Sequence, residues 1–346
     1  MTARWATSPP ASPSRPPPGV SRADLVALPK AELHLHLEGA IRPGTARELA
    51  DRSGLPMPRT GRFADLSEFV VAYEKARDLI GSLDDLRRVA AEVLTTAREN
   101  GVTWTEVHLI PPTYAGRLGP EEAVVEAVLD GLASAASADA AAGLIIGVNR
   151  MLPLEAAERS LSLALTYRDR GVVGLGLAAD EARFPAWLFA SVFRRAAEVG
   201  LPAVPHAGEG AGADSVRVCV EQLGARRINH GVRAVEDPSV VGLLVERGVS
   251  LDVCPTSNVA LGVVPSLEEH PLPALIASGV PVSLNTDCPL FLDTTTVDEY
   301  ALASAAFGLD RAALAGIAET SLRSSSAPAE RRSAALAALD EWRRAG

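Results

Sequence analysis

The sequence predicts a (β/α)₈ barrel with extra helices capping the mouth at the C-terminal ends of the strands. Three observations indicate this fold class. From residue 31 onward, eight short apolar runs alternate with longer stretches of helical period, a pattern typical of parallel sheets. Polar residues stand at the C-terminal ends of several runs, and a length of 346 residues fits one such barrel. An open, doubly wound sheet is the alternative architecture.

The predicted strands are residues 31–37, 103–110, 142–150, 172–178, 202–208, 228–231, 250–255 and 281–287. Among the stretches between them, residues 83–100, 189–200 and 238–248 have the composition and spacing of amphipathic helices. Residues 51–82 hold additional helical sequence between the first two strands. We expect this segment to form the cap over the barrel mouth.

Composition narrows the function classes. The formal net charge of -10 argues against nucleic acid or an anionic membrane as a partner, and no apolar run is long enough for a transmembrane helix. Residues 1–21 are rich in Pro, Ser and Ala and lack an apolar segment, so we expect a disordered tail rather than a secretory signal. Residues 22–346 then form a single domain. Three cysteines without CxxC spacing predict reduced thiols in a cytoplasmic protein.

Histidines stand at the C-terminal ends of the predicted strands. His34 and His36 lie on the first strand, His206 on the fifth and His230 on the sixth, while Asp287 ends the eighth. In a parallel barrel these ends converge on the face where active sites are built. His34 and His36 are two residues apart on a strand, so both side chains point the same way. Imidazoles together with one carboxylate suit a zinc ion that also binds a water molecule.

Packing alone is a weaker explanation for this set. A single inward histidine is more often a satisfied core residue than a ligand. Four histidines and an aspartate at separate strand ends would each need a buried hydrogen-bond partner, and this favours the metal site. For His108, which ends the second strand, pocket-lining and structural roles both stay open. We expect His270 to be a surface or helix-entry residue.

Glu209 lies three residues after His206 in the motif HAGEG, which we place in a glycine-flanked turn at the barrel mouth. Glycines there allow a ligand to approach the backbone closely. A carboxyl group beside a metal in a closed pocket can donate or accept a proton near neutral pH. The alternative interpretation is a carboxylate that caps the N-terminus of a helix.

Five motifs in order, PKAELHLHLEGAIRP, HAGEG, INHGVRAVEDP, CPTSNVALG and SLNTD, resemble those of the adenosine/adenine deaminase family. The similarity runs from about residue 28 to about residue 320. This resemblance implies a (β/α)₈ metal-dependent aminohydrolase that removes the 6-amino group of purines. It also implies zinc ligands at His34, His36, His206 and Asp287. Glu209 then corresponds to the acid that protonates purine N1, and His230 to the residue that orients the metal-activated water and helps to deprotonate it.

Three positions depart from the family pattern, and all three concern substrate contacts. Cys288 replaces a second aspartate that contacts purine N7. Ala179, in LAADE, replaces a glycine whose backbone N–H reaches purine N3. Glu38 stands where nucleoside deaminases usually have an aspartate near the ribose 5′-hydroxyl. A thiol is a weak hydrogen-bond donor, so Cys288 would hold N7 poorly.

The sequence therefore predicts zinc-dependent hydrolytic deamination of adenosine or a related 6-aminopurine nucleoside, with one zinc ion per chain and ammonia as a product. Adenine, aminodeoxyfutalosine and modified purine nucleosides are alternative substrates, and a zinc-binding relative without turnover is a further alternative. A two-metal hydrolase with a bridging lysine is disfavoured, because no lysine ends a predicted strand. The exact substrate, the oligomeric state and the pathway stay open.

Overall fold

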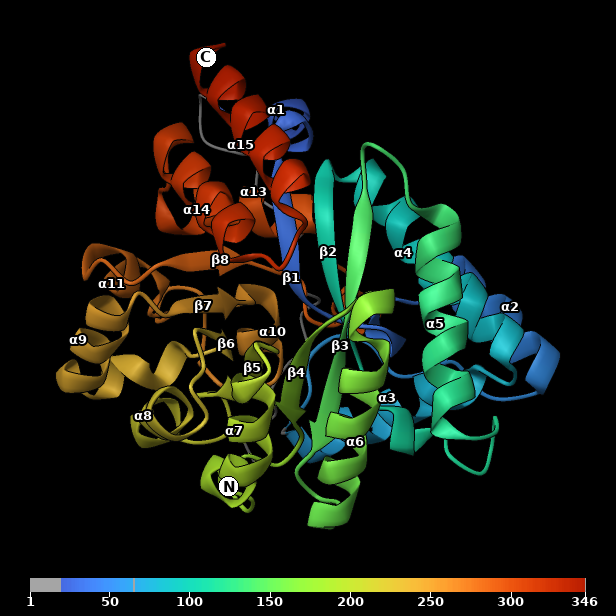
Figure 1. The fold of residues 1–346 in the computed structure, drawn as a ribbon. Coiled ribbons are helices and arrows are strands. Elements are labelled where there is room, and N and C mark those ends of the chain that lie inside the picture. Colours follow the sequence, from blue (N-terminus) through green and yellow to red (C-terminus); the bar gives the residue numbers. More distant parts are fainter. Residues whose placement is uncertain (1–19, 65, 346) are drawn as a thin grey trace, which may run out of the picture.

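Eight parallel strands form one barrel in the computed structural model, which describes residues 20–64 and 66–345 (Figure 1). The strands are β1 (Lys30–His36), β2 (Val102–Leu109), β3 (Ala141–Asn149), β4 (Val172–Ala178), β5 (Ala203–Ala207), β6 (Arg227–His230), β7 (Ser250–Val253) and β8 (Val282–Leu284). Each strand pairs with the next in sequence order. The fold class predicted from the sequence is confirmed, and the open sheet is wrong.

The barrel closes between β8 and β1 through Asp287, just beyond β8. The backbone N–H of Asp287 donates to the carbonyl of His34 at 3.0 Å, and the N–H of His36 donates to the carbonyl of Asp287 at 2.9 Å. β8 is shorter than the predicted run because side chains replace its last ladder bonds. The side-chain oxygen of Asn285 accepts from the N–H of Leu33 at 2.7 Å.

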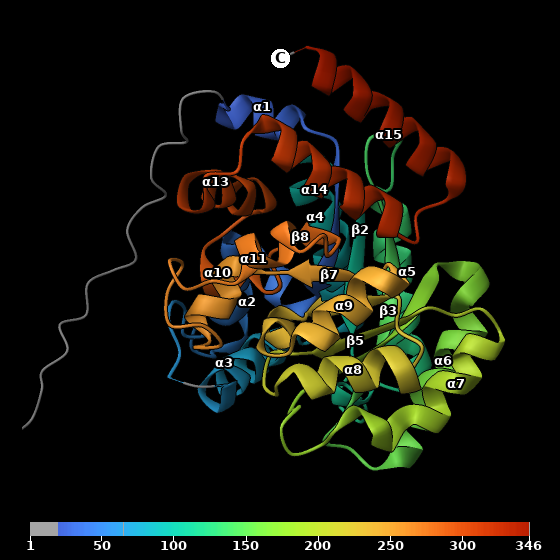
Figure 2. The same cartoon turned by 90° about the vertical axis from the view of Figure 1, so that its left-hand side faces the viewer.

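Helices surround the strands on the outside of the barrel (Figures 1 and 2). They are α1 (Arg22–Ala27), α2 (Pro43–Ser53), α3 (Leu66–Leu79), α4 (Leu83–Glu99), α5 (Glu121–Ala135), α6 (Leu154–Tyr167), α7 (Ala190–Glu198), α8 (Ala213–Gln222), α9 (Pro238–Arg247), α10 (Pro255–Ala260), α11 (Leu272–Ala277), α12 (Pro289–Leu292), α13 (Thr296–Phe307), α14 (Arg311–Ser324) and α15 (Ala329–Arg344). The three predicted helices match α4, α7 and α9 to within two residues at each end. Short 3₁₀ turns follow several strands, including Glu38–Ala40 directly beyond β1.

The cap expected from residues 51–82 contains the end of α2 and the whole of α3. Tyr73 on α3 reaches Glu38 beyond the end of β1, where its hydroxyl donates to the carboxylate at 2.5 Å. The rings of Phe69 and Tyr73 pack against Phe291 of α12, at centroid distances of 5.3 and 6.1 Å. The α3 helix is therefore anchored by aromatic packing beside the mouth.

Residues 1–19, most of the expected tail, lie outside the described residues. Val20 and Ser21, which the sequence pattern also assigned to the tail, belong to the folded part of the chain. Val20 is buried, and Ser21 caps α1 by accepting from the N–H of Asp24 at 3.1 Å. Within residues 20–64 and 66–345, no helix combines the length and the apolar character needed to cross a bilayer.

Candidate metal and catalytic site

The four predicted zinc ligands converge at the C-terminal mouth of the barrel. The Nε2 atom of His206 lies 3.1 Å from the Nε2 atoms of both His34 and His36. Oδ1 of Asp287 lies 3.3 Å from Nε2 of His34 and 3.4 Å from Nε2 of His36. All four residues are buried. The adjacent ends of β1 and β8 thus bring His34 and Asp287, 253 positions apart in the sequence, into contact, and β5 adds His206.

This donor set fits a zinc ion. A tetrahedral ion bound about 2.0–2.1 Å from each ligand separates the ligand atoms by roughly 3.3–3.4 Å, close to the spacing found here. Nδ1 of His206 lies 3.1 Å from the carbonyl oxygen of Leu177. That contact requires a proton on Nδ1, so Nε2 of His206 carries a lone pair directed at the other ligands. A cation bound between these atoms would accept the lone pair of each Nε2.

Electrostatics favours the protonation states that metal binding by these side chains would require. Burial lowers the pKa of His34 to about 4, so its imidazole is neutral at pH 7. Burial by itself would raise the pKa of Asp287, but the neighbouring imidazoles of His34 and His36 hold it well below its usual range. The hydroxyl of Ser257 donates to the other carboxylate oxygen of Asp287 at 2.6 Å and fixes its orientation.

Glu209 and His230 face each other beside this cluster. Oε1 of Glu209 lies 3.4 Å from Nε2 of His230, and burial raises the pKa of Glu209 to about 7. A carboxyl group with that pKa can hold a proton or release it at neutral pH. The helix-cap interpretation of Glu209 is wrong, because Gly212 occupies the N-cap of α8, which has no side-chain cap bond.

Glu181, a residue that sequence reasoning overlooked, holds the turn that carries Glu209. Its carboxylate accepts four backbone N–H groups, from Gly208 (2.7 Å), Glu209 (3.1 Å), Gly210 (2.7 Å) and Ala211 (3.0 Å). Glu181 is 3% exposed, so water does not compete for these bonds. Glu181 ends the motif LAADE, two residues after Ala179, to which substrate contact was assigned. That proximity was the one sequence feature that pointed to a role in the site.

Glu38 is buried beyond the end of β1, and protein groups already contact both of its oxygens. The hydroxyl of Tyr114 donates to one at 2.6 Å, and that of Tyr73 donates to the other. These charge-assisted bonds fix the carboxylate firmly. Both tyrosines were absent from the predicted site, because nothing local in the sequence ties them to Glu38.

Cys288 lies directly against the metal cluster. Its thiol donates to Oδ1 of Asp287 at 3.5 Å, and burial raises its pKa well above the usual value, so it is a neutral thiol. A β-carbon on Gly39 would come within 2.6 Å of the Cys288 Cα, so these two backbones are packed in contact. Ala179 adopts a φ of 78°, the left-handed conformation that favours glycine.

The two remaining histidines are both buried. His108 belongs to the cluster, since its ring centroid lies 5.2 Å from that of His36 and 5.7 Å from that of His206. His270 precedes α11, so its expected place at a helix entry is confirmed. The expectation of a surface position is wrong, because His270 is only 4% exposed. Polar partners inside the fold account for this burial.

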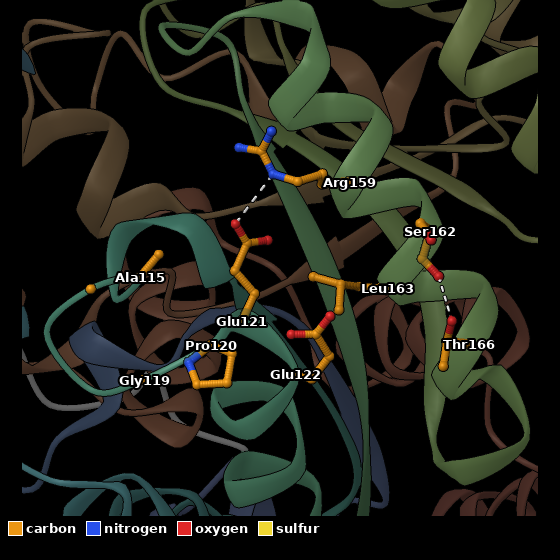
Figure 3. Close-up of a pocket in the computed structure, with 10 residues that line it drawn as sticks. Ala115, Gly119, Pro120, Glu121, Glu122, Arg159, Ser162, Leu163 and Thr166 are labelled. Carbon is orange, nitrogen blue, oxygen red and sulfur yellow. Dashed lines mark hydrogen bonds and ion pairs between the residues drawn. The ribbon is translucent and has the colours of Figure 1, made fainter.

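A wide surface hollow of about 570 Å³ lies elsewhere, between the start of α5 and the outer side of α6 (Figure 3). Glu121 and Arg159 face each other across it at 3.5 Å. Their side chains come from helices outside the barrel, and no residue of the metal cluster lines the hollow. The chemistry of the barrel mouth is therefore separate from this hollow.

Comparison with known proteins places this geometry in a family. The family model described as adenosine deaminase matches residues 29–342. The chain belongs to this family. A putative adenosine/adenine deaminase of Streptomyces virginiae is 40% identical over 334 residues, covering 92% of this chain and 98% of that protein. An adenine deaminase of Bordetella avium is 36% identical, with 87% and 98% covered, and an adenosine deaminase of Erwinia tasmaniensis is 36% identical, with 82% and 89% covered.

Solved structures of adenosine deaminase relatives share the same fold. An adenine deaminase from Arthrobacter aurescens superposes with a TM-score of 0.85 and 31% identity, covering 92% of this chain and 99% of that one. An amidohydrolase from Burkholderia ambifaria, solved with bound Zn, has a TM-score of 0.84 and 28% identity, with 95% and 96% covered. The protein is thus a hydrolase of the adenosine deaminase family, and its barrel mouth carries a candidate metal site.

Proposed function

We propose that the protein binds one zinc ion through His34, His36, His206 and Asp287 and hydrolyses the 6-amino group of adenosine or a related purine nucleoside. The observation that carries this proposal is the convergence of three imidazole Nε2 atoms and one carboxylate oxygen, with His206 3.1 Å from His34 and His36 and Asp287 3.3–3.4 Å from the same two residues. A bound zinc ion lowers the pKa of a coordinated water to about 7 and so supplies the nucleophile. In the overall reaction, water adds at C6, ammonia leaves and a 6-oxopurine remains.

Glu209 supplies the proton chemistry in this proposal. Because burial raises its pKa to about 7, the carboxyl group can give a proton to ring nitrogen N1. That proton relieves the negative charge that attack at C6 would otherwise place on the ring. The carboxylate of Glu181 fixes the backbone on both sides of Glu209, which keeps the acid at one position relative to the ring.

Free adenine is the second candidate substrate, and Glu38 favours it. Both carboxylate oxygens of Glu38 already accept a tyrosine hydroxyl, although the family resemblance would have this position contact the ribose 5′-hydroxyl. A carboxylate engaged in this way gains less from a further donor than a free one. Three relatives with more than 35% identity are named adenine deaminase, which agrees with this alternative.

Ammonia release from a panel of aminopurines tests the proposal and separates the two candidates. The panel contains adenosine, 2′-deoxyadenosine, 5′-deoxyadenosine and adenine, each assayed with zinc-loaded protein. We expect turnover of at least one compound and its loss after chelation. Equal kcat/KM for adenosine and 5′-deoxyadenosine would show that Glu38 does not use the 5′-hydroxyl. No release from any compound, with zinc bound, contradicts the proposed function.

Cys288 is proposed to set the contact with the five-membered edge of the purine. Its position against Asp287 and Gly39 supports a place beside the reacting ring. Cys288→Asp should raise kcat/KM for adenosine about tenfold relative to 7-deazaadenosine, because one hydrogen bond to N7 is worth roughly 0.5–1.5 kcal/mol. If the ratio for the two substrates is the same in wild type and variant, the thiol does not read position 7.

A further inference from the structure

A chain of three buried side chains leads from a helix entry to the catalytic histidine. Nδ1 of His270 accepts a hydrogen bond from the backbone N–H of Leu272 at 3.1 Å. Nε2 of His270 lies 3.2 Å from the side-chain oxygen of Asn258. The side-chain nitrogen of Asn258 then lies 3.1 Å from Nδ1 of His230. All three side chains are at most 4% exposed.

The polarity of this chain follows from its first bond. A backbone N–H can only donate, so Nδ1 of His270 must be unprotonated and Nε2 must carry the hydrogen. Burial lowers the pKa of His270 to about 4, so the ring is neutral at pH 7. Its Nε2–H donates to Asn258, which turns the Asn258 amide so that its NH₂ group faces His230. The opposite amide orientation would place two donors against each other.

We propose that Asn258 and His270 are positioning residues that hold His230 as the tautomer protonated at Nε2. The tautomer follows from the hydrogen bonds alone, and only the role of His230 in the reaction rests on the proposed function. Because the Asn258 NH₂ group donates to Nδ1 of His230, that nitrogen keeps a lone pair.

The tautomer determines what His230 offers to the reaction. Its Nε2–H is directed to the side of the ring where Oε1 of Glu209 lies at 3.4 Å, so His230 donates there. In this form the only lone pair of the ring is on Nδ1, where it accepts from Asn258, so Nε2 cannot take a proton from water. The family resemblance gave His230 two tasks, orienting the water and helping to deprotonate it. The structure assigns it the first, and leaves Glu209 as the acid–base group.

Nitrogen NMR of the zinc-loaded full chain tests this assignment without reference to activity. The chain has only six histidines, so labelled imidazole nitrogens can be assigned by single substitutions. We expect Nδ1 of His230 at the chemical shift of an unprotonated nitrogen and Nε2 at that of an N–H. A protonated Nδ1 in the wild type overturns the proposal.

Two substitutions of His270 then test whether His270 determines the tautomer of His230. His270→Gln keeps an N–H near the position of Nε2, whereas His270→Leu removes the donor and keeps the apolar contact with Phe307. We expect His270→Leu to shift the Nδ1 signal of His230 towards the protonated value. Its kcat should fall about tenfold, the effect of one neutral hydrogen bond, with KM and zinc content unchanged. His270→Gln should retain most of the wild-type turnover and the wild-type signal.

The outcomes separate the positioning role from the function. An unchanged Nδ1 signal in His270→Leu overturns the positioning role, whatever the rate. If Nδ1 is unprotonated in the wild type and shifts in His270→Leu, the tautomer assignment is supported even when no aminopurine is turned over. Absence of turnover with every aminopurine would overturn the proposed function but not the tautomer assignment.

Discussion

Replacing Glu181 by glutamine changes one carboxylate oxygen to an NH₂ group and leaves the shape of the side chain almost the same. In the structure, Oε2 accepts from the N–H groups of Glu209, Gly210 and Ala211, while Oε1 accepts from Gly208 alone. The amide oxygen of glutamine can replace only one of these two acceptors. Fewer hydrogen bonds are lost if the amide oxygen takes the place of Oε2, which accepts three of the four N–H groups. The NH₂ group then takes the place of Oε1 and faces the N–H of Gly208.

The cost of Glu181→Gln follows from these bonds. A buried N–H without an acceptor costs about 1–3 kcal/mol, and bonds to a charged oxygen contribute about 1.5–3 kcal/mol, more than those to a neutral one. The backbones of Gly208 and Gly231 are closely packed, since a β-carbon on Gly208 would lie 3.2 Å from the backbone of Gly231. Gly208 therefore has little room to turn by itself towards another acceptor. The turn therefore shifts as a unit and carries Glu209 with it. A displacement of about 1 Å at a catalytic group can cost about 10²-fold in rate.

We expect Glu181→Gln to lower kcat by about 10²-fold with zinc content unchanged, measured by ammonia release and metal analysis. The control is Glu198→Gln, which makes the same change at an exposed position on α7 and should leave kcat unaltered. Turnover within threefold of wild type in Glu181→Gln would refute this reasoning, provided that its thermal unfolding shows an intact fold. The position of Glu209 would then have to depend on other contacts.

Three other perturbations test separate parts of the structure. His34→Ala or Asp287→Ala should abolish zinc binding and turnover, and so should a chelator with wild-type protein; activity that persists in metal-free protein contradicts the site. Glu209→Gln should lower kcat by about 10²–10⁴-fold with zinc retained, whereas a loss below tenfold would mean that another group protonates the ring. Lys30, buried beneath the barrel, has its pKa lowered to about 7 by burial. In the unfolded chain this lysine has an ordinary pKa near 10.4. Between about pH 7 and pH 10.4 the unfolded chain therefore binds more protons than the folded one. The free energy of unfolding should rise with pH over this range, by up to about 1.4 kcal/mol per pH unit. Lys30→Met should remove that rise in denaturant titrations, and an unchanged slope would show that Lys30 is not the source.

The barrel could be predicted from the sequence because its signals are local. Each apolar run is followed by a helical stretch, and the predicted ends of seven strands differ from the observed ones by no more than two residues. The convergence of the candidate metal ligands was predictable for a related reason. In a parallel barrel, every strand end points to one face, so His206 and Asp287 could be placed together without any knowledge of the residues between them.

The residues that hold the site in place could not be found in this way. Glu181 acts on a turn 27–30 positions further along the chain, and its partners are backbone groups, which leave no trace in side-chain pattern. His270 contacts His230 only through Asn258. A histidine before a proline and a helix has the same local sequence whether it is exposed or buried. Such roles depend on the path of the loops rather than on periodicity.

Backbone conformation supplies a physical link between these parts. Three of the four non-glycine residues with positive φ in the described part of the chain lie at or just beyond strand ends in the site: Ala179 (78°), His230 (64°) and Asp287 (60°). Each left-handed residue costs about 1–2 kcal/mol, and such strain persists only where surrounding contacts fix the chain. At Asp287 those contacts are visible. Its N–H and carbonyl both pair with β1, and the left-handed turn lets the carboxylate face the imidazoles while the backbone closes the barrel. Asp287, a candidate metal ligand, is therefore also the residue that joins the last strand to the first, so the geometry of the site is set by closure of the fold itself.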